Sequence, residues 1–285
     1  MTEHEADRQI AREIMSQLPA AYEVMPADVL VGFITTNRNA KHRRSEVTLQ
    51  LVANMLEWSA SLPFEPFLIE ACLTPPKHRA EFERLYQAGP IGHAADGRAV
   101  VIERIGAIPP REFCERVTAD EMIRQIMFNR QAAFAWNRAR SYAHGRLLRQ
   151  AVVVIDLSGF STAHLSADFL KLTTTYIGTQ ETYPEVSTGL YIINAPIIFR
   201  AAWKVVSPLL NPVTRDKCKI FGGPASYGPA FEQMGIVTDG PIEDCRPSWV
   251  EAMRRLAPTG KISPAFLTPE ELDMYQCGME VAPPE

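Results

Sequence analysis

The stretch YPEVSTGLYIINAPIIFRAAW, residues 183–203, places an almost entirely apolar helix directly after an almost entirely apolar strand. It contains GLYIIN (189–194), whose β-branched and aromatic residues are typical of a buried strand. A helical pattern follows at once, with Pro196 in its first turn, and we expect this helix to cover residues 196–210. The order of strand and helix predicts an α/β unit at this point of the chain.

The predicted helix has more apolar surface than one core requires. On a helical wheel its apolar residues fill an arc of roughly 240°, and only Arg200, Lys204 and Ser207 hold the polar side. A helix that packs on a single core needs an apolar stripe a little over ~100° wide. The surplus fits a helix buried between a sheet and a second helix. It equally fits a helix that lines a cavity for an apolar ligand and swings towards a membrane, and periodicity does not separate the two interpretations.

Strands and helices alternate on both sides of this stretch. Upstream, AVVIER (99–104) and AVVVID (151–156) have the composition of buried strands, and helical patterns cover residues 119–146 and 163–177. Downstream, a short strand is expected at residues 219–221. Such alternation predicts an α/β fold with a mostly parallel sheet.

The flanking regions differ in character from this alternating part. Residues 1–87 show helical patterns, and GPIGHAADGR (89–98) is predicted as a loop because glycine and proline punctuate it. We therefore expect an N-terminal helical region over 1–87 and an α/β lobe over 88–245. A C-terminal tail with short helices, residues 246–285, is expected to wrap or trail the lobe.

One of the N-terminal helices is expected within residues 45–62. Ser45 is its expected N-cap, because a serine hydroxyl can accept a hydrogen bond from the first turn of a helix. The apolar residues that fall together on its expected buried face are Val47, Leu51, Met55 and Leu56.

Charge and cysteine content argue against several classes of protein. A formal net charge of −4 over 285 residues argues against a dedicated nucleic-acid surface, since phosphate binding normally needs a basic excess on one face. The five cysteines lack CxxC spacing, and their odd number is typical of free thiols in a reducing compartment. The charged N-terminus has no apolar region of the kind found in secretory signals, and no run is long enough to span a bilayer. We expect a cytoplasmic protein.

No established catalytic or metal-binding motif stands out. The sequence contains neither GxxxxGK[ST] nor GxGxxG, and its six histidines show no HExxH or HxH spacing. Ser158 follows the strand AVVVID, where an α/β hydrolase places its nucleophile, but LSGFS lacks the GxSxG turn. We expect no catalytic residue, no metal ligand and no cofactor, with a serine hydrolase as the enzyme alternative.

The segment YPEVSTGLYIINAPIIFRAAWKVVSPLLNPVTRDKCKIFG (183–222) resembles the signature segment of the CRAL-TRIO lipid-binding family. That family includes fungal phosphatidylinositol/phosphatidylcholine transfer proteins and carriers of tocopherol and retinaldehyde. The resemblance extends to DGRAVVIERIGAIPP (96–110), to VVVIDLSGFS (152–161) and to the N-terminal helices, over about residues 25–235. It implies a CRAL-TRIO-like fold whose sheet and helices enclose an apolar lipid pocket.

The resemblance also explains the surplus apolar face. In this family the helix after IINAP is the gate that closes over a bound lipid and opens at a membrane. A lipid exposed to water loses roughly 0.8 kcal/mol for every CH₂ group, so carriage requires an enclosed pocket and exchange requires a lid. The gate residues that the resemblance implies are Ile198, Phe199, Ala202, Trp203 and Val206, and the implied pocket residues are Val153, Ile155, Leu190 and Ile192.

A headgroup site is implied in the same way. Family members that bind phosphatidylinositol use a glutamate in the YPE motif and a lysine shortly after the gate, which match Glu185 and Lys217. A carboxylate accepts hydrogen bonds from inositol hydroxyls, and an ammonium together with the Thr214 hydroxyl can hold the phosphodiester. Taken singly, such residues are more often a glutamate before a strand and a lysine in the last turn of a helix. Their pairing within this motif favours the headgroup site.

This chain departs from the family pattern in two places. Transfer proteins that also bind phosphatidylcholine place small hydroxyl residues on the strand that here contains Ala151 and Val153, so the resemblance does not extend to that lipid. The arginine-rich N-terminal hairpin is replaced by VGFITTNRNAKHRRSE (31–46). A phosphate contact there is either missing or supplied by Arg38, Lys41, Arg43 or Arg44.

Together these observations predict a non-enzymatic carrier that binds lipid, most specifically phosphatidylinositol, and moves it between membranes. The expected partners are lipid and, transiently, a membrane surface. We expect a monomer that binds no nucleic acid. The alternatives are a carrier or a sensor of another hydrophobic ligand, such as a sterol, a tocopherol or an isoprenoid, that regulates lipid signalling.

Overall fold

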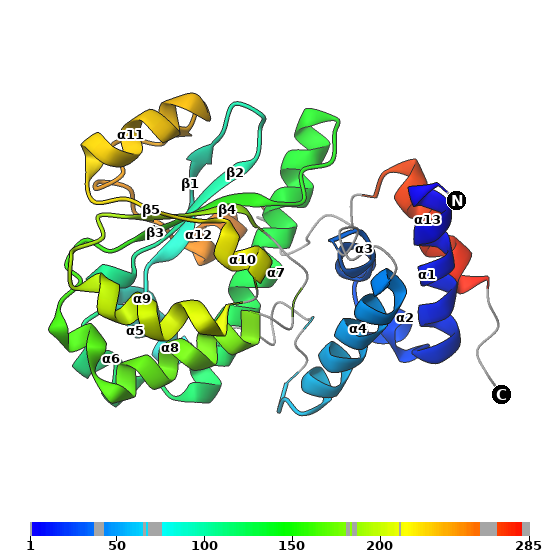
Figure 1. Ribbon diagram of the computed structural model, residues 1–285, viewed down its shortest axis with the longest axis horizontal. Coiled ribbons are helices and arrows are strands. Elements are labelled where there is room, and N and C mark those ends of the chain that lie inside the picture. The colour runs from blue at the N-terminus through cyan, green and yellow to red at the C-terminus, as the bar shows by residue number, and fades with distance from the viewer. Residues whose placement is uncertain are drawn as a thin grey trace. The chain divides into compact units, whose positions relative to one another are not determined.

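The computed structural model describes residues 2–36, 43–64, 67, 76–180, 183, 187–210, 212–256 and 267–280 (Figure 1). The chain forms two compact units. Unit 1 comprises Met1–Ala71, Thr182–Glu185 and Pro264–Glu285, and unit 2 comprises Cys72–Glu181 and Val186–Ser263. The C-terminal segment is thus shared, because α12 (Trp249–Leu256) belongs to unit 2 and α13 (Pro269–Met279) to unit 1.

Unit 1 is built from helices around a small apolar core. Helix α1 starts with a capping box in which the Thr2 hydroxyl accepts from the Glu5 N–H and the Glu5 carboxylate accepts from the Thr2 N–H. Helix α3 is the most apolar, with Leu30 and Ile34 fully buried. The other helices of this unit, besides α13, are α1 (Glu3–Gln17), α2 (Ala20–Val24), α3 (Ala27–Thr36) and α4 (Arg44–Ala60).

Helix α4 differs from its prediction at its start. The expected N-cap was wrong: the helix begins at Arg44, and the Ser45 hydroxyl donates to the carboxylate of Glu13 on α1 instead of capping. The Arg44 guanidinium is buried, where it pairs with Asp7 and donates to the carbonyl of Ile34 at 3.0 Å. These long-range polar contacts set how the helix is rotated against its neighbours.

The buried face of α4 is correspondingly shifted by one position for most of its length. Thr48 and Val52 are fully buried, whereas Val47 and Leu51 are only half-buried. Met55 is buried as expected. The apolar periodicity predicted where the helix lies. Its contacts with neighbouring helices of the same unit determined which of its faces is buried.

The C-terminal helix α13 packs against α1 within unit 1. His4 lies 2.9 Å from Asp273, and the rings of Tyr22 and Tyr275 are 5.1 Å apart. A glycine is required at position 278, because a Cβ atom there would lie 1.8 Å from the hydroxyl of Tyr22. The helix that was expected to wrap or trail the lobe is therefore part of the helical unit.

Unit 2 contains one six-stranded sheet in the order β5-β4-β3-β2-β1-β6. Strands β2, β3, β4 and β5 are parallel to one another, and β1 runs antiparallel to both β2 and β6. The predicted α/β fold with a mostly parallel sheet is confirmed. The strands are β1 (Ala88–His93), β2 (Ala99–Glu103), β3 (Ala151–Asp156), β4 (Ser187–Ile193), β5 (Cys218–Ile220) and β6 (Val237–Thr238).

The longest helix of unit 2, α7, has clear signals at both ends. Thr118 and Glu121 form a capping box at its start, and Gly145 with φ of 61° ends it. The helices and 3₁₀ turns of this unit, besides α12, are α5 (Pro76–Leu85), η2 (Ile105–Ala107), α6 (Pro110–Arg116), α7 (Ala119–His144), η3 (Thr162–Leu165), α8 (Ala167–Gln180), α9 (Phe199–Val206), η4 (Ser207–Leu209), α10 (Pro212–Asp216) and α11 (Pro224–Gln233).

The loop predicted over residues 89–98 was wrong in its first half, which is strand β1. Its glycines permit close backbone approaches within the sheet. A Cβ atom at Gly92 would lie 2.0 Å from the Val237 carbonyl oxygen of β6, and one at Gly89 would lie 2.6 Å from the backbone nitrogen of Ser248. The two glycines that suggested a turn are thus explained by the close packing of other segments of the same chain against the strand.

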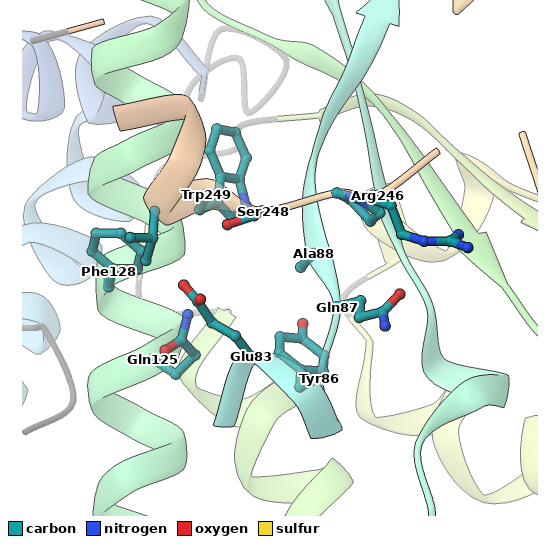
Figure 2. A pocket seen from close by; sticks show the side chains of 11 residues that line it. Glu83, Tyr86, Gln87, Ala88, Gln125, Phe128, Arg246, Ser248 and Trp249 are labelled. Carbon is teal, nitrogen blue, oxygen red and sulfur yellow. The ribbon is translucent and has the colours of Figure 1, made fainter. Parts of the chain in front are cut away.

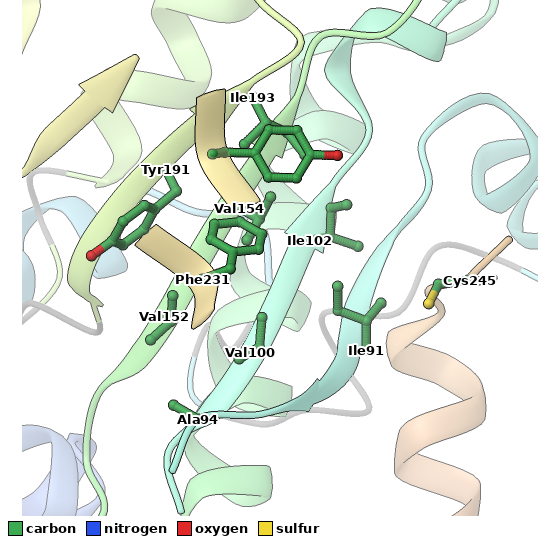
Figure 3. Close-up of a cluster of buried hydrophobic side chains, with 11 residues drawn as sticks. Ile91, Ala94, Val100, Ile102, Val152, Val154, Tyr191, Ile193, Phe231 and Cys245 are labelled. Carbon is green, nitrogen blue, oxygen red and sulfur yellow. The ribbon is translucent and has the colours of Figure 1, made fainter. Parts of the chain in front are cut away.

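One face of the sheet is fully packed. Val100, Val154 and Ile193 are 0% exposed and lie in a cluster with Tyr191 of β4 and Phe231 of α11. Figure 3 shows Phe231 and Tyr191 beside the aliphatic side chains of the central strands, and Figure 1 shows α11 on this side of the sheet with α8 and α9 on the other. The face on the side of α8 and α9 is less completely packed, since Val153, Ile155 and Leu190 are only half-buried there.

Candidate functional site

Two central strands leave apolar side chains half-exposed on the second face of the sheet. Val153 and Ile155 of β3 and Leu190 of β4 are only half-buried, whereas Val154, on the opposite face, is 0% exposed. The register pairs Val153 with Leu190 and Ile155 with Ile192, so all four side chains share one face. Central strands of a parallel sheet are normally covered on both faces. We call these four residues the open face: Ile192 is buried, at 3% exposed, and the protein covers the other three only in part.

Helix α9 packs over part of the open face. Its Phe199 and Ala202 are 9% and 4% exposed and lie in a cluster with Leu157 and Ile192. Trp203 packs at the edge of this cluster. Of the five residues predicted to form a gate, Phe199 and Ala202 thus face the protein. The other three, Ile198, Trp203 and Val206, are only half-buried.

The helix predicted over residues 196–210 is shorter than expected. Its α-helical part is Phe199–Val206, and Ser207–Leu209 forms the 3₁₀ turn η4. Before it, a turn brings the N–H of Phe199 to the carbonyl of Pro196 at 2.9 Å. The tighter turns at both ends leave a short helix whose role as a gate stays a prediction.

The outer side of this segment exposes large apolar side chains. Ile197 is 84% exposed, Val205 46% and Leu209 44%. Single exposed apolar residues are common on protein surfaces, whereas three within one short segment are more typical of an interaction site. The apolar surface of residues 196–210 therefore contacts the open face on one side of the segment and is exposed to solvent on the other.

A buried polar network lies at the start of this segment. Asn194 has a φ of 54°, unusual for a non-glycine residue, and its side-chain amide donates to Asp156 Oδ1 at 2.8 Å. Arg104 donates to Asp156 Oδ2 at 2.7 Å and also to the carbonyls of Ile242 and Cys245. The ends of β2, β3 and β4 and the chain before α12 are thereby joined at one carboxylate.

Ser158 belongs to the same network. Its hydroxyl donates to Asp156 Oδ1 at 2.8 Å and its backbone N–H to the same oxygen at 2.9 Å. His164 faces elsewhere, because its Nδ1 accepts from the Ser161 N–H at 3.1 Å and its ring stacks on Phe160. Within the described residues, no histidine is hydrogen-bonded to the Ser158 hydroxyl, so the arrangement is that of a structural serine.

Two of the three predicted headgroup residues are described, and they lie close together. The backbone N–H of Lys217 donates to the carbonyl of Thr214 at 3.2 Å, at the end of α10. The Lys217 ammonium donates to the Ser187 carbonyl at 3.3 Å, which places its positive charge at the first residue of β4. Glu185 lies outside the described residues, two positions before Ser187 in the sequence.

Next to Lys217, Cys218 begins β5. Burial raises the pKa of its thiol to about 11, so the sulfur is an uncharged group at this place. The side chain that follows Lys217 in the sequence, Cys218, therefore adds no charge beside the ammonium.

A polar cluster on the open-face side of the sheet was missed by sequence reasoning. Glu103 is in register with Ile155, and it accepts hydrogen bonds from the hydroxyls of Tyr86 at 2.9 Å and of Tyr176 at 2.7 Å. Burial, reinforced by the nearby Glu103 carboxylate, raises the pKa of both tyrosines well above the usual range. The sequence feature that could have identified this cluster is the alternation of side chains along strand 99–103, which places Glu103 on the same face as Val101.

Side chains that could ligate a metal are scattered in the described part of the chain. No group of three or more histidine, cysteine, aspartate or glutamate side chains there is arranged to hold a metal ion. Cys114, Cys218, Cys245 and Cys277 are free thiols. Of the helices that the structure describes, none is both long and apolar enough to cross a bilayer.

The predicted substitute for a family phosphate contact is partly tested. Arg44 is buried against Asp7, so its guanidinium serves the fold of unit 1. Arg43 is exposed and pairs with Glu46 at 3.1 Å. Arg38 and Lys41 lie outside the described residues.

Comparison with known proteins adds to this geometry. Residues 85–228, just over half of the chain, match the CRAL/TRIO domain. A crystal structure of Sfh5 superposes with a TM-score of 0.61 at 15% sequence identity, covering 97% of this chain and 98% of that one. At this identity the likeness concerns the fold.

Sequence relatives are similar over the same region. The SEC14 cytosolic factor of Yarrowia lipolytica is 31% identical over 150 residues, which are 51% of this chain and 30% of that protein. The phosphatidylinositol/phosphatidylcholine transfer protein SFH9 of Arabidopsis thaliana is 28% identical over 197 residues, 66% of this chain and 33% of that protein. Protein real-time of Anopheles gambiae is 29% identical over 157 residues, 55% and 23% of the two chains. The match spans about a quarter to a third of the length of these relatives.

Proposed function

The chain belongs to the CRAL/TRIO domain family, and on this premise we propose that it binds a lipid non-covalently and carries it between membranes. The observation that carries the proposal is the open face, where apolar residues of two central strands stay half-exposed. Apolar surface in the middle of a sheet is stable only if something covers it. Acyl chains of a lipid are the cover that we propose, with residues 88–245 as the lipid-binding lobe.

Helix α9 is the proposed gate of this pocket. It contacts the sheet through Phe199 and Ala202 and presents Ile197 and Val205 to the outside. An apolar outer side favours contact with the apolar interior of a membrane, and movement of the helix would then uncover the open face. The hydrogen bond from Asn194 to Asp156 would hold the start of the segment in place while the helix moves.

Phosphatidylinositol is the ligand that we propose. Lys217 and the Thr214 hydroxyl would hold the phosphodiester, and Glu185 would accept hydrogen bonds from the inositol hydroxyls. The Lys217 ammonium lies at the carbonyl of Ser187, and Glu185, outside the described residues, enters the proposal from the sequence motif alone. Phosphatidylcholine is not proposed as a second ligand, because β3 offers Ala151 and Val153 where a phosphocholine group would need hydroxyls.

The proposed working form is a cytoplasmic monomer that visits membranes transiently. This part of the proposal follows the cytosolic factors and the transfer protein to which the chain is similar. The site is assigned no covalent chemistry, since the hydroxyl of Ser158 is engaged with Asp156.

Ligand identity is tested by native mass spectrometry and lipid extraction of the protein purified from a eukaryotic host. Phosphatidylinositol in the extract supports the proposal. A sterol, a tocopherol or an isoprenoid alone would refute the headgroup assignment and leave a carrier or sensor of that ligand. Hydrolysis of a simple ester that is lost in Ser158→Ala would favour the hydrolase instead.

The headgroup site has a matched pair of lysine variants. Lys217→Ala should lower phosphatidylinositol transfer between vesicles by about tenfold, the effect of losing one charge-assisted contact. Lys219→Ala removes the same charge two residues away, where the ammonium lies 5.3 Å from the Tyr191 ring on the packed face, and should leave transfer unchanged. Equal loss in both variants would contradict the site.

A further inference from the structure

The outward side of α9 continues through the turns at both of its ends. Before the helix, the N–H of Arg200 donates to the carbonyl of Ile197 at 3.2 Å, and after it the 3₁₀ turn η4 continues the chain. Exposed residues recur along this segment at intervals of three and four, which places them on one side. We call this side the outer stripe, and its residues are Ile197, Arg200, Ala201, Lys204, Val205 and Leu209.

The charge of the outer stripe is entirely positive. Arg200 and Lys204 are exposed and lie about one helical turn apart, and residues 186–215 contain no aspartate or glutamate. Among the residues that the structure describes, neither of these two side chains is paired with a carboxylate. Both positive charges are therefore available to an anionic partner.

Large apolar side chains alternate with these cations on the same side. Ile197 is 84% exposed, Val205 46% and Leu209 44%. A helix that faces only solvent on its outer side usually places its apolar residues on the buried side and charges of both signs on the other. Here the buried side is already supplied by Phe199 and Ala202. Exposed aliphatic side chains together with cations, and without acids, fit a partner that is apolar and anionic at once.

We propose that the outer stripe binds the surface of an anionic bilayer, so that the chain attaches to membranes rich in acidic lipids in preference to neutral ones. Such a bilayer presents negative headgroups directly above its acyl chains. Aliphatic side chains can enter this boundary while the long arginine and lysine side chains keep their charges at the headgroups. The inference rests on the proposed gate and adds the class of membrane that the gate meets.

The outer stripe offers side chains to be inserted and needs no preformed pocket. Ile197, at 84% exposed, protrudes from the surface. A cavity of about 150 Å³ in unit 2 lies elsewhere, between α5, β1, α7 and the chain that enters α12, and no residue of α9 lines it (Figure 2). A protein partner is usually held by anchor side chains that fill pockets. A fluid lipid surface accepts protruding side chains directly, which favours a bilayer over an acidic protein.

Vesicle sedimentation with the full chain tests the proposal. The probes are vesicles of phosphatidylcholine alone and vesicles that also contain about 30% phosphatidylserine. Neither contains phosphatidylinositol, so attachment is measured apart from exchange of the proposed ligand. We expect at least about tenfold tighter attachment to the phosphatidylserine vesicles at low salt. Most of this difference should disappear at an ionic strength of about 0.5 M, because salt screens the charges.

Two double variants of equal net charge locate the effect. Arg200→Gln with Lys204→Gln should weaken attachment to the phosphatidylserine vesicles by about 25-fold, which is about fivefold for each cation lost near the surface. Attachment to the phosphatidylcholine vesicles should change less than about twofold. Arg254→Gln with Arg255→Gln makes the same change of charge on α12, at side chains that are 69% and 71% exposed. This control should change neither attachment by more than about twofold.

Three results would overturn the proposal. These are equal attachment of the wild type to both kinds of vesicle, equal losses in the two double variants, or binding of soluble poly-L-glutamate as tightly as of the vesicles, which would identify an acidic protein as the partner. Circular dichroism of each variant detects a folding defect. If the stripe variant does not fold, the wild type decides, since attachment that salt does not weaken would refute the proposal. Selective attachment without any lipid transfer would instead refute the proposed carrier, so the two failures can be told apart.

Discussion

At the scale of single residues, Asp156 joins several parts of unit 2. It accepts hydrogen bonds from Asn194 before the proposed gate, from Ser158 after β3 and from Arg104 after β2. Both Asp156 and Arg104 are buried, at 3% and 8% exposed. A buried ion pair of this kind adds little net stability, but the loss of one partner leaves the other charge uncompensated.

The variant Asp156→Ala should therefore lower the free energy of unfolding by about 3–5 kcal/mol. Urea denaturation followed by tryptophan fluorescence measures this change. Glu115→Ala is the control, because its exposed pair with Arg111 should contribute less than about 1 kcal/mol. Equal effects of the two substitutions would show that the network at Asp156 is not a structural centre.

His164 predicts a pH dependence of stability. It is 3% exposed, and burial lowers the pKa of its imidazole below the usual 6.5. The unfolded chain then takes up a proton near pH 6.5, while the folded chain resists it until lower pH. The free energy of unfolding should thus fall as the pH drops through 6.5 towards the folded pKa.

Removal of the titrating group tests this prediction. His164→Phe keeps a ring beside Phe160 and Phe169 and should show a smaller loss of stability between about pH 7.5 and pH 5.5 than the wild type. Denaturation midpoints across this range give the answer. Superimposable pH profiles of the two proteins would rule out a contribution from His164.

At the scale of elements, α9 carries the proposed exchange of lipid. Ile197→Glu places a charge at a position that is 84% exposed, so the fold should be unaffected. Insertion of a glutamate into a membrane is unfavourable, and vesicle binding and lipid transfer should fall by about tenfold or more. Transfer assays and vesicle sedimentation measure both effects.

A matched variant separates the gate from surface charge in general. Leu272→Glu makes the same kind of change at a residue that is 44% exposed on α13. It should leave vesicle binding and transfer close to the wild type. If Ile197→Glu transfers lipid normally, the outer side of α9 does not enter the membrane.

Elements also show why sequence patterns succeed and fail. Helix α7 was predicted almost to its ends from its helical pattern, and the structure shows that a capping box at Thr118 and a glycine at position 145 mark these ends locally. Strand β1 was missed because its glycines are typical of turns. They are needed there because β6 and the segment before α12 pack too closely for a side chain. Helix α4 was found, but its buried face was misassigned because Arg44 pairs with Asp7 on another helix.

At the scale of the whole molecule, α13 closes unit 1 by packing on α1. Gly278→Leu should separate the two helices, because even a Cβ atom would lie 1.8 Å from the Tyr22 hydroxyl. Hydrogen exchange should then lose protection in α1 and α13, while β2, β3 and β4 in unit 2 stay protected. Gly178→Ala in α8, where a Cβ atom meets nothing within 4 Å, is the control and should keep full protection. Loss of protection in both units would show that they unfold together.

The sequence alone determined the alternation of strands β2 to β5 with helices, the family likeness and the surplus apolar surface of residues 196–210. These features depend on periodicity and on local caps, which act within a few residues of the chain. The candidate gate and the apolar strands could therefore be predicted. The Lys217 and Thr214 pair was also named from the sequence, although only by resemblance to a family motif.

Only the tertiary structure decided which face of the sheet is packed and which is the open face. It also decided that Glu103 meets two tyrosines, that Glu83 and Trp249 line one cavity, and that α13 joins α1. These contacts join residues far apart in the chain. Their formation depends on which surfaces meet when the elements pack, and no local pattern contains that information.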